Sequence, residues 1–105
     1  MLPATMETVN SSETQPATEE VQYIADQVKP QFESRENRTY STFQAIEYRT
    51  QVVAGINYFI KVQISDFDTG YAHLRVFQAS REEKQGPRLD RYETGKTRDD
   101  PLDYF

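Results

Sequence analysis

Apolar and polar residues alternate along positions 56–64. Every second position carries an apolar residue, namely Ile56, Tyr58, Ile60, Val62 and Ile64. A period of two is typical of a β-strand that buries one face. The stretch before it, 43–50, is rich in aromatic and β-branched residues. The two stretches together predict an antiparallel hairpin whose turn lies within 51–55.

A single amphipathic helix is predicted near the N-terminus. Its apolar stripe has offsets of 3, 4, 7 and 11 residues and consists of Val21, Ile24, Ala25, Val28 and Phe32. Pro16 or Thr18 can begin this helix. Two glutamates lie in its first turn, where their negative charges interact favourably with the helix dipole. Pro30 removes one helical hydrogen bond, but it lies opposite the stripe, so a kink is expected there rather than the end of the helix.

The order of these elements predicts the fold class. Three long strands are expected at about 41–53, 56–66 and 71–80, and a weaker one at about 88–97. One helix followed by consecutive strands is typical of an α+β protein, in which an antiparallel sheet wraps across the helix. The helix stripe would pack on the apolar face of that sheet.

The expected hairpin tip, Gln51 to Gly55, is unusual because it is mostly apolar. Turns are normally built from Asn, Asp, Ser, Pro and Gly, which satisfy the backbone locally and tolerate water. Only Ala54 and Gly55 provide a turn signal, since glycine readily adopts the positive φ that a tight hairpin requires. Val52 and Val53 are therefore either a binding surface covered by a partner, or simply the ends of two strands.

Composition and charge exclude several classes of function. The chain has 105 residues, which suits one domain, and we place that domain at 13–105 after a flexible extension at 1–12. The net charge is −5 and no stripe of Lys and Arg stands out, so nucleic acid is not an expected partner. The chain contains no cysteine, which excludes a disulfide framework, a thiolate metal site and a cysteine nucleophile. Neither a secretory signal nor a run of about 20 apolar residues is present, so no membrane role is expected.

Nothing in the sequence favours catalysis. The only histidine, His73, lies in an expected strand, where a structural role is more common than a catalytic one. The paired carboxylates fall in polar loops, where they are normally solvated, at 66/68, 82/83 and 99/100. No phosphate-binding glycine loop or cluster of metal ligands is visible, and no cofactor is expected.

Four segments of the chain resemble one known family. The residues Gln51 to Gly55, followed by Asn57 to Val62, resemble the first inhibitory hairpin of the cystatins, in the form found in the small, disulfide-free stefins. Residues 14–28 resemble the stefin helix entry, residues 73–78 resemble the third long strand, and residues 92–105 resemble the C-terminus. The resemblance covers about residues 12–105 and adds a short first strand, which makes five strands in all.

The resemblance implies a function, a set of contacts and a location. Stefins inhibit papain-like cysteine proteases reversibly and without a covalent bond, so the expected partners are cathepsins of the L, B, H and S types. The implied protease-binding residues are those of the first hairpin (Gln51, Val52, Val53, Ala54 and Gly55), the N-terminal trunk (Val9 and Asn10) and the second hairpin (Ser80 and Arg81). The expected location is the cytoplasm, with the nucleus as a further compartment.

Two positions depart from the stefin pattern. Val9 stands where stefins carry a glycine, and Ser80-Arg81 stands where they usually carry Leu-Pro. These departures leave open a cystatin-fold binding module with weak or lost inhibition. A third alternative is assembly, because the first hairpin could open and exchange between chains, giving a domain-swapped dimer beside the expected monomer.

Overall fold

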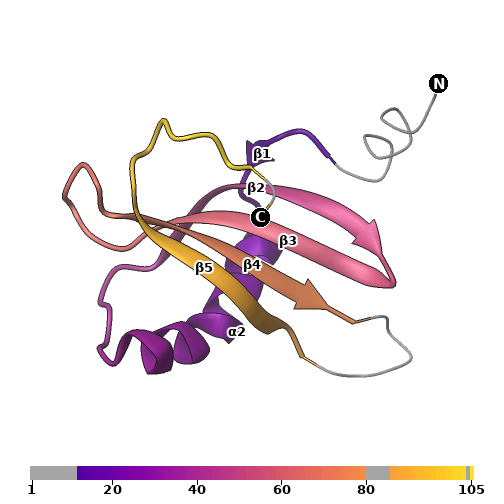
Figure 1. The fold of residues 1–105 in the computed structure, drawn as a ribbon, viewed down its shortest axis with the longest axis horizontal. Coiled ribbons are helices and arrows are strands. Elements are labelled where there is room, and N and C mark those ends of the chain that lie inside the picture. The colour runs from indigo at the N-terminus through magenta and orange to yellow at the C-terminus, as the bar shows by residue number, and fades with distance from the viewer. Residues whose placement is uncertain (1–11, 80–85, 104) are drawn as a thin grey trace.

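The protein is built from one helix and five strands. The computed structural model describes residues 12–79, 86–103 and 105. The elements, in chain order, are β1 (Gln15–Pro16), α2 (Glu19–Glu36), β2 (Gln44–Val53), β3 (Gly55–Gln63), β4 (Tyr71–Gln78) and β5 (Arg88–Lys96). The strands form one antiparallel sheet in the order β1-β2-β3-β4-β5, and this sheet curves across the helix (Figure 1). The predicted α+β class is confirmed.

The helix begins and ends at residues suited to those positions. Thr18 is the N-cap, and its hydroxyl accepts a hydrogen bond from the amide of Val21 at 3.2 Å. Asn37 closes the helix in the left-handed conformation, with φ 60°, and its amide donates to the carbonyl of Glu33. Pro30 is exposed, and the helix continues six residues beyond it to Glu36. The prediction that the helix does not end at this proline is therefore confirmed.

The core lies between the helix and the inner face of the sheet. All five residues of the predicted apolar stripe are buried there. The inner face of the sheet contributes buried residues from β2, β3, β4 and β5, namely Ala45, Ile60, Val62, Ala72, Leu74, Val76 and Leu89. Phe32 closes one end of this core, where its ring packs against Tyr40, Phe43 and Tyr92. The period of two in β3 thus reflects one face that packs on the helix.

Two glutamines of the helix bind the main chain of the sheet. Gln22 hydrogen-bonds to both a carbonyl and an amide in the segment 43–45, at 3.1 and 2.8 Å. Gln31 does the same in the segment 87–89, at 3.2 and 2.8 Å. Each amide side chain satisfies a donor and an acceptor where a strand begins, and it therefore fixes the helix at both flanks of the sheet.

The outer face of the sheet is covered by residues 97–103 and 105, the C-terminal segment, which turns back from β5 toward β2 and β3 (Figure 1). Three cations of the sheet donate to main-chain oxygens of this C-terminal segment. Arg49 donates to Leu102 at 3.1 Å, and Arg75 donates to Phe105 at 2.8 Å. Lys61 donates to Arg98 and Asp100, the latter at 2.7 Å. The C-terminal segment thus forms a second layer that is held by hydrogen bonds from charged groups.

Apolar contacts complete this second layer. The rings of Phe59 and Phe105 lie edge to face, with centroids 5.8 Å apart, and Leu102 is buried. Lys61 is fully buried and also forms an ion pair with Glu47 at 3.3 Å. The sequence pattern placed Phe59 and Lys61 on the polar face of β3, but the C-terminal segment removes both from water.

His73 lies within the same layer, directly across from Lys61 in the register of β3 and β4. Its side chain is 2% exposed, and no hydrogen-bond partner is present for Nε2 among the described residues. Burial, and then the charge of Lys61, lower the pKa of His73 from 6.5 to about 4. The imidazole is therefore neutral at pH 7 and its role is structural.

The buried histidine makes stability depend on pH. Because its folded pKa lies below its unfolded pKa of 6.5, the unfolded chain binds the proton more readily between pH 6.5 and about 4. The contribution of the neutral histidine to the free energy of unfolding is fully present above this window and is lost as the pH falls through it. The loss is on the order of 2–3 kcal/mol at pH 4. Urea unfolding at pH 7, 6 and 5 should show a steeper loss for the wild type than for His73→Gln.

NMR provides the direct measurement, because this is the only histidine in the chain. Its imidazole resonances should not move between pH 8 and 6. A titration midpoint near 6.5, or parallel unfolding profiles for the two proteins, would contradict the assignment.

Candidate functional site

The first hairpin is as tight as the sequence predicted. A single residue, Ala54, separates β2 from β3, and Val53 pairs directly with Gly55. Gly55 has φ 131°, a backbone conformation that residues other than glycine rarely adopt. The two strands therefore reverse sharply at the right-hand end of the molecule in Figure 1.

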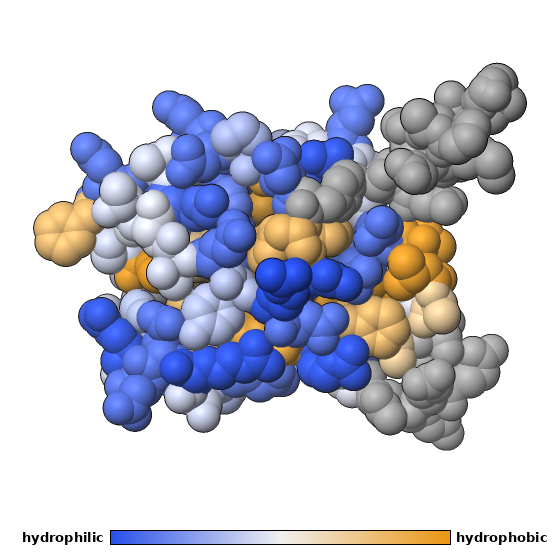
Figure 2. Space-filling model, in the orientation of Figure 1, coloured by the Kyte–Doolittle hydropathy of each residue, from blue (hydrophilic) through white to orange (hydrophobic). Residues whose placement is uncertain are grey.

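The tip of this hairpin is both apolar and exposed. Val52 and Val53 end β2 and are 57% and 48% exposed, and Ala54 is also exposed. Figure 2 shows the corresponding apolar surface at that end of the molecule. The valines are thus strand ends, as one alternative proposed, but the fold does not bury them.

Gly55 is required for a second reason that the sequence did not reveal. A Cβ atom at this position would lie 2.6 Å from the carbonyl oxygen of Gln78 and 2.9 Å from the ring of Phe77. Real Cβ atoms do not approach other atoms so closely, so the tip packs against the end of β4 only because this residue has no side chain. The first hairpin is consequently braced by its neighbour.

Gln51 stabilises the other side of the tip. Its side-chain oxygen accepts a hydrogen bond from Nδ2 of the buried Asn57 at 3.3 Å, across the two strands. This cross-strand bond fixes the hairpin directly before the exposed valines. Gln51 is half-buried, so part of its side chain stays accessible to a partner.

The chain N-terminal to β1 is attached beside the hairpin. The amide of Ser12 donates to the carbonyl of Thr50 at 2.9 Å, and its hydroxyl accepts from the amide of Thr50 at 2.8 Å. Arg49 adds a third bond, from Nε to the carbonyl of Ser12 at 3.2 Å. Val9 and Asn10 lie outside the described residues, but Ser12 places the start of the described chain next to the tip.

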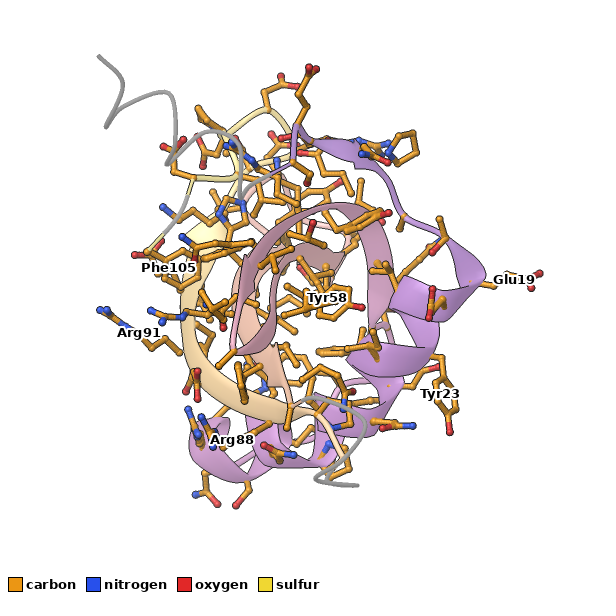
Figure 3. All side chains as sticks on the ribbon, turned by 90° about the vertical axis from the view of Figure 1, so that its right-hand side faces the viewer. Glu19, Tyr23, Tyr58, Arg88, Arg91 and Phe105 are labelled. Atoms are coloured by element: carbon orange, nitrogen blue, oxygen red, sulfur yellow. The ribbon has the colours of Figure 1, made fainter. Side chains whose placement is uncertain are left out.

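The ends of β4 and β5 lie on the other side of the tip. Gln78 pairs with Ile56, one residue from Gly55. Arg88 pairs with Phe77, which is level with Asn57, two residues from Gly55. Ser80 and Arg81 lie outside the described residues. The segments that lead to all three predicted contact elements thus meet at one end of the sheet, which faces the viewer in Figure 3.

The electrostatics of this end do not resemble an active site. Tyr58, on the inner face near the tip, has a raised pKa because burial disfavours the phenolate, with a smaller effect from Glu20. Its hydroxyl therefore stays protonated at neutral pH. In the described part of the chain there is no group of three or more His, Cys, Asp or Glu that could hold a metal, and no helix has the length and apolar character needed to cross a membrane.

A helix packed on an open five-stranded antiparallel sheet, with an exposed apolar hairpin at one end, defines the architecture of a cystatin. Residues 10–98 match the cystatin domain family. The chain is 52% identical to cystatin-A of Felis catus and 50% identical to cystatin-B of Homo sapiens, in each case over 90% of this chain and 94% of the relative. It is 49% identical to stefin-C of Bos taurus, over 90% of this chain and 91% of the relative. The chain therefore belongs to the stefin group of the cystatin family.

Family membership establishes the general activity. Cystatins and stefins are inhibitors of cysteine proteases and not enzymes. The predicted class of function and the predicted class of partner are both confirmed at this level.

Proposed function

We propose that the protein blocks the active-site cleft of papain-like cysteine proteases by inserting the tip of its first hairpin, reversibly and without a covalent bond. The observation that carries this proposal is the exposure of Val52 and Val53 on a turn that Gly55 and Gln51 hold rigid. Cathepsins of the L, B, H and S types are the proposed targets.

The rigid tip explains how a small surface can bind tightly. About half of each valine side chain is still exposed, so burying the rest in a cleft contributes about 1–1.5 kcal/mol per residue. The braced turn loses little conformational entropy on binding, so most of that free energy appears as affinity. Gly55 lets the main chain approach the catalytic centre closely, and the tight turn presents no peptide bond in the extended form that a protease cleaves.

The flanking segments are proposed to contact the protease on either side of the tip. The N-terminal trunk, with Val9 and Asn10, would extend from Ser12, whose hydrogen bonds to Thr50 support this placement. Ser80 and Arg81 would contact the protease from the turn between β4 and β5. We propose the trunk as residues 1–12 and the inhibitory domain as 13–105, with the cytoplasm as the compartment and the nucleus as a second one.

The monomer is the proposed inhibitory form. In a domain-swapped dimer the hairpin opens, β2 and β3 become one long strand, and the turn at Ala54 no longer exists. Exchange and inhibition would therefore compete. Gel filtration of each sample before the assay separates the two forms.

The test is a titration of purified monomer against papain and a cathepsin L-type enzyme, following hydrolysis of a fluorogenic peptide. We expect reversible inhibition with a dissociation constant in the nanomolar range or below, about −12 kcal/mol. Activity that returns on dilution would establish reversibility. No inhibition at micromolar monomer would overturn the proposal and favour a binding module that has lost the activity.

A further inference from the structure

Three arginines lie on the outer face of the sheet, between the hairpin end and the middle of the strands, in a protein whose net charge is −5. Arg88 and Arg91 belong to β5, and Arg75 lies opposite Arg91 on β4. Figure 3, which looks onto the hairpin end, shows Arg88 and Arg91 on the side of the molecule away from Glu19 and Tyr23 of the helix. We call these three residues the arginine patch.

The first member of the patch is connected to the tip through an aromatic ring. The guanidinium of Arg88 lies over the ring of Phe77, 5.2 Å from its centroid, and the same ring abuts Gly55. Arg88 is largely exposed and forms an ion pair through Nε with Asp90 at 2.8 Å. Along the strands Arg88 is level with Asn57, about 7 Å from Gly55, and Arg91 is level with Phe59, about 13 Å from Gly55.

Arg91 is the member of the patch whose side chain has neither an ion pair nor a hydrogen bond among the described residues. It is exposed and forms no ion pair within the described residues, and it stands directly across from another arginine. Like charges in directly opposite positions destabilise a sheet. Arg75 donates to the main-chain oxygen of Phe105, but nothing equivalent is found for Arg91 in the described chain. An acidic group supplied by a partner would remove this unfavourable interaction.

We infer that the arginine patch, through Arg91, recognises acidic side chains on the rim of the target protease beside its active-site cleft. This inference rests on the proposed function, because the tip must enter the cleft for the patch to face the rim. The favoured targets are papain-like proteases with a negatively charged surface on that side. Since the patch lies at the edge of the contact, its charge should act mainly on the rate of association.

The test measures association rates with a cathepsin L-type enzyme at 10 mM and 500 mM salt, for the wild type and for variants at Arg91. At low salt, Arg91→Gln should associate about 3-fold more slowly and Arg91→Glu about 10-fold more slowly, whereas dissociation rates should change little. At high salt the three rates should converge, because screening shortens the range of the interaction to about 4 Å. Arg91→Lys keeps the charge and should retain the wild-type rate.

Arg38→Gln is the matched control, because it removes the same charge from an exposed arginine at the opposite end of the molecule. Equal rates for Arg91→Gln and Arg38→Gln, or a wild-type rate that does not depend on salt, would overturn the inference while leaving the inhibitory function intact. A wild type that does not inhibit at all would overturn both.

Discussion

Replacing Val53 by aspartate is expected to weaken protease binding roughly 100- to 1,000-fold while leaving the fold unchanged. The substitution places a carboxylate where an apolar cleft must receive the tip, and an unpaired charge in such a site costs on the order of 3–4 kcal/mol. Val53 is about half exposed in the free protein, so the same change costs the folded monomer little. The inhibition constant and the thermal unfolding midpoint of the variant provide the two measurements.

Phe67→Asp is the control for this experiment. Phe67 is 77% exposed in the turn between β3 and β4, at the other end of the sheet from the first hairpin. Its replacement also exchanges an exposed apolar side chain for a carboxylate, and it should leave inhibition within about 2-fold of the wild type. If Val53→Asp inhibits as well as Phe67→Asp, the hairpin tip is not the surface that enters the cleft. Loss of the folded circular dichroism spectrum would show instead that Val53 belongs to the core.

The largest loss of stability is expected for Lys61→Ala. Its buried ammonium group is the shared partner of Glu47 and of the carbonyls of Arg98 and Asp100, so its removal deprives three partly buried acceptors of their donor. The lost charged hydrogen bonds and the cavity left by the buried lysine stem should together cost about 3–5 kcal/mol, which is a large part of the stability of a domain of this size. Urea unfolding should show this loss, together with a midpoint of thermal unfolding lowered by roughly 15 °C.

Two further variants separate charge from packing at this position. Lys61→Met keeps the aliphatic stem but not the ammonium, so it should recover part of the loss while remaining at least about 2 kcal/mol less stable than the wild type. Lys29→Ala removes a lysine from the helix, where Nζ lies 6.0 Å from the ring of Phe43, and should cost about 1 kcal/mol or less. Equal effects of the two alanine substitutions would show that the C-terminal layer does not depend on Lys61.

The same layer connects stability to the function. Arg49 binds both Leu102 of the C-terminal segment and Ser12 beside the hairpin. A change that loosens the C-terminal segment would therefore also loosen the side chain of Arg49. The hydrogen bond from Arg49 to Ser12, next to the tip, would then weaken. Hydrogen exchange in Lys61→Met should reveal this as faster exchange at the amide of Thr50, which donates to Ser12.

The sequence alone was sufficient for the elements that depend on local patterns. The period of two in β3 and the stripe from Val21 to Phe32 are set by side-chain direction within one strand or one helix, so neighbours along the chain reveal them. The turn at Ala54-Gly55 was also predictable, because positive φ strongly favours glycine. Four segments in family order added the five-stranded fold, together with the still untested proposal that the hairpin is the inhibitory element.

Only the tertiary structure decided the features that depend on residues far apart in the chain. The close contact of Gly55 with β4, the binding of Gln22 and Gln31 to the starts of two strands, and the place of Arg91 opposite Arg75 each need the register of the sheet. The burial of Lys61 and His73 needs the C-terminal segment to cross the outer face. A single sequence records which side of a strand a residue occupies, but it does not record what covers that side. Polar side chains are usually on the solvated face, so a buried lysine and a solvated one look alike until the covering segment is seen.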